Sequence, residues 1–329
     1  MLHIHNGDSS ADTAKLSTIP GEHFAFREAL IEGPNPGELD HAEWRRVRAR
    51  HLSQGYSVDM DQCERELMEQ ENKLATFAEH EEIVFWFEHD LFCQVNLIYL
   101  LNWFGQQSLG ETKLSLVCVG EFPGKVNFRG LGELDAAELS SLFPGRQPVT
   151  QQQLDLANSA WQAYCSNDPT EIQTLLEADM SALPFLGAAL AAHLRRFPST
   201  VNGLGSIEKK SLELLAAGLK NFSDLFWQFG EAEPLYGLGD SQLWLALRRM
   251  SEAGQSLLTI EGRQNGEPVL TPEFGKAELE ITEVGRAVLK GDSDFVALNG
   301  IDLWLGGVHL SGAKDLWRWD QQSQRLVAT

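Results

Sequence analysis

The stretch Ile83-Val84-Phe85-Trp86-Phe87-Glu88-His89-Asp90 joins an uninterrupted apolar and aromatic run to three ionisable side chains. A run of this kind is typical of a strand that is buried on both faces of a parallel sheet. A helix-like stretch, Leu91 to Phe104, follows it, and Leu114 to Val119 is a further candidate for a buried strand. This order of strand, helix and strand predicts a parallel sheet with crossover helices.

Two earlier apolar runs also lead directly into polar residues. Leu2-His3-Ile4 is followed by Asn6-Gly7-Asp8-Ser9, and His23-Phe24-Ala25-Phe26 is followed by Arg27-Glu28 and then Glu32. If these runs and the run at residues 83–87 are parallel strands, their polar ends meet at one edge of the sheet. That edge is where open α/β sheets bind ligands, so the pattern predicts a binding site there.

The composition changes along the chain and predicts three segments. We expect a Rossmann-like α/β domain over residues 1–150, with a parallel sheet and flanking helices, and a helical connecting segment over residues 151–205. Residues 206–329 are expected to form a winged-helix-like α+β domain with an extra C-terminal hairpin, because a hairpin follows three helices. The expected elements are helices Glu208 to Leu219, Ser223 to Phe229 and Ser241 to Ala253, strands Leu257 to Ile260 and Glu278 to Ile281, and helix Glu283 to Leu289.

Charge and length limit the classes of function. The chain has 329 residues, enough for two or three domains. Its 26 Lys and Arg against 47 Asp and Glu give a formal net charge of −21, so bulk attraction to polyphosphate is absent. Residues 207–329 hold 12 basic and 18 acidic residues, a net charge of −6. DNA binding through Arg248 and Arg249 is therefore less expected than a protein partner for this domain.

The sequence also predicts a cytoplasmic protein that does not enter a membrane. Residues 1–6 lack the features of a secretory signal, and the longest apolar stretch, Val95 to Phe104, is too short to span a bilayer. The four cysteines are far apart and form no C-x-x-C pair, which favours reduced thiols over disulfides or a zinc site.

The polar residues after the three runs are the candidate site. We assign them roles from their chemistry: carboxylates bind hard cations, His and Glu transfer protons, hydroxyls attack, and Arg clamps anions. The metal candidates, for Mg²⁺ or Mn²⁺, are Asp8 and Asp90. The catalytic candidates are Ser9, Glu88 and His89, and the ligand-binding candidates are Asn6, Arg27, Glu28, Glu32 and Gln94.

Each of these assignments has a plainer structural alternative. Asp90 can cap the following helix, with Glu88 and His89 solvated, and Asp8-Ser9 can cap the helix after the first strand. Arg27, partly buried between two apolar runs, is expected in an ion pair with Glu28 and Glu32. The sequence leaves these alternatives open.

Several segments in chain order carry a family resemblance. They are Asn6-Gly7-Asp8-Ser9, Arg27 to Pro34, Trp86 to Leu91, Phe128 to Glu133, Gly306 to Leu310 and Trp317 to Asp320. With these segments the chain resembles the longer members of the bacterial "domain of unknown function 1835" family. The resemblance implies no established activity and no residue with a known role.

Two hypotheses of function follow. In the first, the Rossmann-like domain binds a phosphorylated small molecule or a nucleotide and acts as a metal-assisted hydrolase or transferase. In the second, the protein is a non-enzymatic regulatory or interaction module whose winged-helix-like domain contacts a protein partner.

Overall fold

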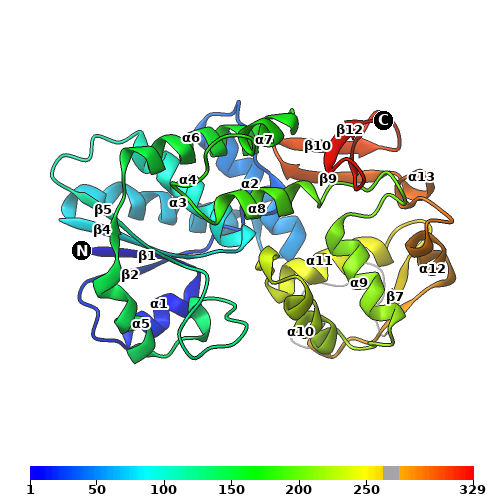
Figure 1. The fold of residues 1–329 in the computed structure, drawn as a ribbon, viewed down its shortest axis with the longest axis horizontal. Helices are drawn as coiled ribbons and strands as arrows, with labels where there is room; N and C mark the ends of the chain where they lie inside the picture. The colour runs from blue at the N-terminus through cyan, green and yellow to red at the C-terminus, as the bar shows by residue number, and fades with distance from the viewer. Residues whose placement is uncertain (262–273) are drawn as a thin grey trace.

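The computed structural model describes residues 1–261 and 274–329 and shows a mixed α/β protein (Figure 1). Its largest sheet has five strands, mostly parallel, with helices on both faces. Smaller sheets, mainly antiparallel, lie toward the C-terminus. The predicted α/β class with a parallel sheet is therefore confirmed.

The strand order of the main sheet is β2-β1-β4-β5-β6. Its strands are β1 (Leu2–Asn6), β2 (Glu22–Phe26), β4 (Glu82–Glu88), β5 (Lys113–Val119) and β6 (Gln147–Pro148), and only β6 is antiparallel to its neighbour. The three polar-ended runs are thus adjacent parallel strands, with Asn6 opposite Phe26 and His5 opposite Trp86. Their carboxyl ends lie at the same edge, as the sequence predicted.

Side chains of β4 alternate between two cores, as the pleat of a strand requires. Ile83, Phe85 and Phe87 belong to the larger core with α4 (Leu91–Gly105). Val84 and Trp86 belong to a smaller core with α1 (Asp8–Lys15) and α5 (Ala136–Leu142). Figure 1 shows α1 and α5 below the sheet, and α3 (Met60–Ala75), α4 and α6 (Gln151–Cys165) above it.

The middle segment is helical, as predicted. Thr150 caps α6 by accepting a hydrogen bond from the Gln153 N–H, and α6 packs along α4. The other elements of residues 27–200 are β3 (Gly33–Pro34), α2 (His41–Tyr56), η1 (Thr76–Glu79), η2 (Leu131–Glu133), η3 (Phe143–Gly145), α7 (Thr170–Leu175) and α8 (Leu186–Leu194). Within residues 1–261 and 274–329, no helix is long and apolar enough to cross a membrane.

The C-terminal part has the predicted order of three helices, a hairpin and a helix. Its elements are α9 (Ser206–Ala216), α10 (Phe222–Ala232), η4 (Pro234–Tyr236), α11 (Asp240–Ser251), β7 (Leu258–Ile260), η5 (Phe274–Lys276), β8 (Leu279–Ile281), α12 (Glu283–Lys290) and α13 (Phe295–Asn299). Strands β7 and β8 are antiparallel. Thr282 caps α12, since its hydroxyl accepts a 2.9 Å hydrogen bond from the Gly285 N–H.

Four more strands complete the chain: β9 (Ile301–Gly306), β10 (Val308–Gly312), β11 (Trp317–Asp320) and β12 (Arg325–Ala328). Strand β9 pairs with β10 and also with β3, more than 260 residues earlier, in the sheet order β10-β9-β3. Through this pairing, the loop after β2 contacts the C-terminal part of the chain. The domain limits at residues 150 and 205 stay a prediction.

Candidate functional site

Polar side chains at the ends of β1 and β4 form a hydrogen-bonded group, here called the strand-end cluster. Its members are Asn6, Glu88, Asp90, Cys93, Gln94 and Asn96, and the Glu28 backbone carbonyl also joins it. The Asn96 amide donates to the Asn6 side-chain oxygen and to the Glu28 carbonyl, both at 2.7 Å, and the Asn6 amide donates to Cys93 Sγ at 2.9 Å. Asn6 and Glu28, two of the predicted ligand-binding residues, therefore lie close together, but both accept hydrogen bonds from Asn96 of the protein itself.

Glu88 lies at the centre of this cluster and is buried. Its carboxyl group accepts a 2.5 Å hydrogen bond from the Leu131 N–H and one from the Cys93 thiol, and the Gln94 amide donates to its carbonyl at 2.6 Å. Burial, together with the nearby Asp90 carboxylate, raises the pKa of Glu88 to about 7. The interpretation of Glu88 as a solvated residue is wrong, because the loop at Gly130 covers it.

Asp90 caps α4, as the plainer interpretation predicted. Its carboxylate accepts a 2.9 Å hydrogen bond from the Cys93 N–H. The C-terminal part covers it: Gly237 has φ +60°, and a Cβ there would lie 2.1 Å from Asp90 Oδ1. Burial raises the pKa of Asp90. Next to Asp90, His89 is half-buried, and its ring makes an edge-to-face contact with the Phe185 ring.

The strand-end cluster includes a possible set of cation ligands. One ligand atom each of Glu88, Asp90 and Cys93 lies within 4.8 Å of the others, and Asp8 does not belong to this group. Mg²⁺ favours oxygen ligands, whereas this set includes a thiol whose pKa is raised by burial and by the neighbouring carboxylates. The expectation of Mg²⁺ or Mn²⁺ therefore stays a prediction, with Asp8 outside the set.

The expected ion pair of Arg27 with Glu28 and Glu32 is wrong. Arg27 is 60% exposed and pairs with Asp8, at 2.6 Å, because the ends of β1 and β2 are adjacent. Glu28 instead points into the core, where it forms a 2.5 Å ion pair with Arg48. Both side chains of that pair are buried, at 2% and 0% exposure.

The interpretation of Asp8-Ser9 as the cap of the first helix is wrong. The N-cap of α1 is Gly7, which has φ +93° and provides no side-chain hydrogen bond. Asp8 stands in the first turn, where a negative charge complements the helix dipole. The exposed Ser9 hydroxyl donates to the Gly132 carbonyl at 3.3 Å.

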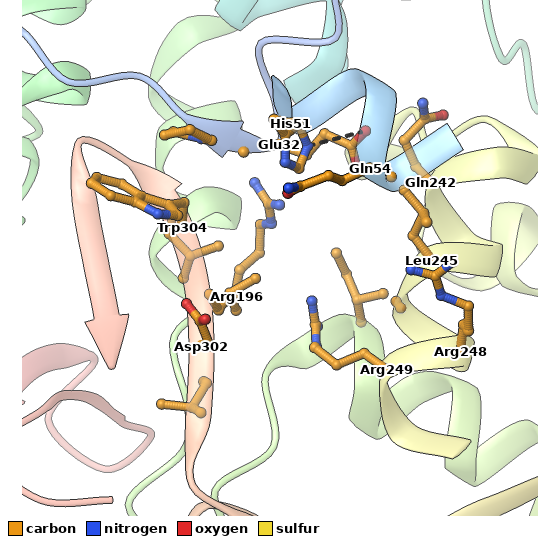
Figure 2. Close-up of a pocket in the computed structure, with 18 of the residues that line it drawn as sticks. Glu32, His51, Gln54, Arg196, Gln242, Leu245, Arg248, Arg249, Asp302 and Trp304 are labelled. Atoms are coloured by element: carbon orange, nitrogen blue, oxygen red, sulfur yellow. Dashed lines mark ion pairs between the residues drawn. The ribbon is translucent and has the colours of Figure 1, made fainter. Parts of the chain in front are cut away.

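A cavity of about 1190 Å³ lies away from the strand-end cluster, between the N-terminal and C-terminal parts (Figure 2). Its walls come from α2, β3, α9, α11 and β9, with further residues after α8 and in α13. Four arginines contribute to its lining: Arg50, Arg196, Arg248 and Arg249. We call it the arginine cavity.

The two arginines of α11 are paired within the protein. Arg249 pairs with Glu208 of α9, and Arg248 lies 3.5 Å from Glu252, one turn further along α11. These are the arginines that the sequence offered for contact with DNA. Figure 2 shows them on the α11 side of the cavity, opposite Trp304 and Asp302.

Arg196 and Arg50 differ from the two arginines of α11, because neither forms an ion pair with a carboxylate of the described residues. Arg196 is buried, and its Nη1 donates to the Ile31 carbonyl at 2.6 Å. Its Nε has no hydrogen-bond partner among the described residues. Arg50 is exposed on α2 and lines the same cavity. Figure 2 shows the Arg196 guanidinium extending toward His51 and Gln54.

Glu32 is the one predicted site residue among the described lining residues of this cavity. Its carboxylate accepts a hydrogen bond from the Tyr56 hydroxyl, which in turn accepts a 2.7 Å bond from the Gln242 amide of α11. His51 Nε2 lies 3.9 Å from Glu32 Oε1. Burial acts to raise the pKa of Glu32, but His51, Tyr56 and Arg48 outweigh it, so the pKa is lowered and the group is ionised near neutrality.

The sequence analysis missed Arg50, His51 and Arg196. One local signal was present for Arg196, since Arg195-Arg196 directly follows the apolar helix α8. No local signal marked Arg50 or His51, which belong to a helix rich in Arg and His. Arg196 comes from a distant segment and meets the N-terminal part through its hydrogen bond to the Ile31 carbonyl, a tertiary contact that no local pattern shows.

No protein-family model matches the chain, and no curated protein matches it.

Proposed function

We propose that this protein binds a phosphorylated small molecule in the arginine cavity. Buried Arg196 carries the proposal, because the described residues leave its Nε without an acceptor and its charge without a carboxylate. A buried charge without a counter-charge is costly. Phosphate oxygens match the planar donor fork of a guanidinium, so a phosphorylated ligand would supply both the acceptor and the charge.

The pattern of ion pairs in the cavity, rather than its net charge, supports an anionic ligand. Glu208 and Glu252 neutralise the two arginines of α11, and Asp302 Oδ1 lies 2.7 Å from the His309 ring. Glu32 has its own partners in Tyr56 and His51. The described lining holds four arginines and four carboxylates, equal in formal charge, and Arg50 and Arg196 are the two of these arginines without an ion pair among the described residues.

The size of the cavity is consistent with this ligand class. Small-molecule sites usually have volumes of about 300–1,000 Å³. A cavity of about 1190 Å³ therefore has room for a ligand of nucleotide size together with ordered water.

A regulatory role is the second candidate function, and the position of the cavity favours it. Its walls come from α2 in the N-terminal part and from α9, α11 and β9 in the C-terminal part. A ligand that contacts both walls would favour the arrangement in which they face each other. This supports a ligand-responsive interaction module, with a protein partner at the C-terminal part.

The hypothesis that the protein is an enzyme is supported by the carboxyl groups of the strand-end cluster. There, Glu88 and Asp90 lie close together, and the pKa of Glu88, raised by burial to about 7, suits proton transfer. A metal-assisted hydrolase or transferase remains a proposal for that cluster, with Ser9 and His89 as its other candidates.

We also propose the finer fold assignments. The order β2-β1-β4-β5 supports a Rossmann-like sheet with its switch point between β1 and β4. Helices α9, α10 and α11 followed by the β7–β8 hairpin support a winged-helix-like unit. Membership of the "domain of unknown function 1835" family is proposed on the sequence segments alone.

The test is thermal unfolding of the full chain with inorganic phosphate, pyrophosphate, ribose 5-phosphate and nucleotides, with and without Mg²⁺ or Mn²⁺. A bound ligand stabilises the native state, so at about 100 times Kd the midpoint should rise by a few degrees. Arg50→Gln should reduce this rise. Arg46→Gln is the matched control, since Arg46 is an exposed arginine of the same helix outside the cavity lining.

The two variants separate the outcomes. A rise that is reduced in Arg50→Gln and unchanged in Arg46→Gln supports binding in the arginine cavity. An equal rise in wild type and Arg50→Gln would contradict the assignment of this cavity. The absence of any rise with every compound would contradict the proposed function itself.

A further inference from the structure

Trp304 forms part of the wall of the arginine cavity, and one face of its indole is stacked on a histidine. Its indole stacks on the imidazole of His309, with 4.4 Å between the ring centroids and 2° between the planes. His309 Nε2 lies 2.7 Å from Asp302 Oδ1, so a third, largely exposed residue contacts the imidazole. The three side chains form an ordered stack at the edge of the cavity.

Backbone pairing explains why this stack forms. Trp304 of β9 and His309 of β10 are directly opposite in the antiparallel pair, so their side chains stand on the same face of the sheet. Asp302 is two residues before Trp304 on β9, so it lies on the same face of the sheet. A ring that is already oriented loses little conformational freedom when a second ring stacks on it.

The stack and the arginines belong to the same cavity. Figure 2 shows Trp304 and Asp302 on one side, with Arg196 between them and the residues of α11. Gln54 and Gln242 also line the cavity and offer amide groups, which can donate and accept hydrogen bonds. An aromatic surface, buried positive charge and neutral amides are the groups that contact the base, the phosphate and the sugar of a nucleotide.

We infer that the ligand is a nucleotide whose base stacks on Trp304 while its phosphate groups contact Arg196 and Arg50. This inference rests on the proposed function and narrows it from phosphorylated small molecules to nucleotides. Stacking of one base on one aromatic side chain changes affinity by roughly five- to a hundredfold. Nucleotides should therefore bind more tightly than phosphorylated compounds that lack a base.

The test is calorimetric titration of the full chain with AMP, GMP, UMP and ATP, and with ribose 5-phosphate and pyrophosphate as probes without a base. At least one nucleotide should bind the wild type about tenfold or more tightly than ribose 5-phosphate. Trp304→Leu should remove this preference, and Trp304→Phe should keep part of it. Trp227→Leu, at an exposed tryptophan outside the cavity lining, should keep all of it.

The outcomes distinguish this inference from the proposed function. If ribose 5-phosphate or pyrophosphate binds in an Arg50-dependent way and no nucleotide binds more tightly, the inference fails and the proposed function stands. The inference also fails if Trp304→Leu keeps the full preference for nucleotides. If no phosphorylated compound binds the wild type, both fail. The comparison within the wild type needs no variant, so a misfolded variant leaves the test intact.

Discussion

The strand-end cluster and the arginine cavity both contain buried polar groups, but they differ in how those groups are satisfied. In the strand-end cluster, Asn6, Glu88 and Asn96 have hydrogen-bond partners within the protein. In the arginine cavity, the Nε of Arg196 has none among the described residues. The Nε of the structural Arg48 also lacks a partner, but Arg48 has a carboxylate, and Arg196 has none among the described residues. A buried charge in a cavity without a counter-charge points to a ligand.

The comparison also shows why the sequence directed attention to the first region. Polar residues directly after buried strands are a local pattern, and it located the ends of β1, β2 and β4. The same pattern does not reveal whether those residues face a ligand or each other. Glu28 shows the difference, because it follows β2 but turns inward to Arg48.

The largest expected effect is a loss of stability when Arg48 is substituted. It tests whether the buried Glu28–Arg48 pair stabilises the fold. Arg48→Met leaves the Glu28 carboxylate buried without its partner, so the free energy of unfolding should fall by about 3–5 kcal/mol, measured by urea titration. The double variant Glu28→Leu with Arg48→Met buries no charge and should recover part of the loss.

The matched control is Arg27→Gln. The Arg27–Asp8 pair is 60% and 51% exposed, so solvent screens it and its loss should cost less than about 1 kcal/mol. Equal losses for Arg48→Met and Arg27→Gln would contradict the distinction between a buried structural pair and an exposed one.

Much of the fold follows from local signals. The apolar run at residues 83–87 predicts β4, Thr150 marks the start of α6, and Thr282 marks the start of α12. The order of strands and helices then limits the topology to a parallel sheet. The β3–β9 pair could not be predicted, because Gly33–Pro34 is too short to show a periodic pattern and its partner lies more than 260 residues away.

The second prediction concerns pH and tests the burial of Glu88. The folded protein holds the Glu88 proton up to about pH 7, whereas the unfolded chain releases it near 4.5. The folded state binds more protons between these values, so the free energy of unfolding should fall as pH rises from about 4.5 to 8, by roughly 3 kcal/mol. Asp90, whose pKa is also raised by burial, acts in the same direction.

Glu88→Gln isolates this contribution. The amide is neutral at every pH, so urea titrations from pH 5 to pH 8 should show a smaller fall in stability for the variant than for the wild type. The general effect of the −21 net charge is present in both proteins and cancels in the comparison. Parallel curves for the two proteins would show that Glu88 does not hold a proton near neutrality.

The candidate site was only partly predictable, for a physical reason. Glu32 was found because it follows an apolar run, and it does line the arginine cavity. Arg196 and Trp304 come from distant segments, and tertiary contacts bring both to this space: Arg196 through its hydrogen bond to Ile31, and Trp304 through the pairing of β9 with β3. A cavity between distant segments depends on tertiary packing, and periodicity within one segment does not record it.

The smallest expected effect on stability is at Arg50. This residue gives the clearest test of the difference between a ligand-binding residue and a structural one. The side chain is exposed and has no ion-pair partner in the part of the chain that the structure describes. Arg50→Gln should therefore change the free energy of unfolding by less than about 0.5 kcal/mol, measured by urea titration without ligand. A loss of 2 kcal/mol or more, on the scale of a buried pair (about 3–5 kcal/mol), would mean that Arg50 serves the fold. Because a structural arginine weakens the protein whether or not a ligand is present, unchanged stability combined with weakened phosphate binding is the result that only a ligand-binding arginine gives.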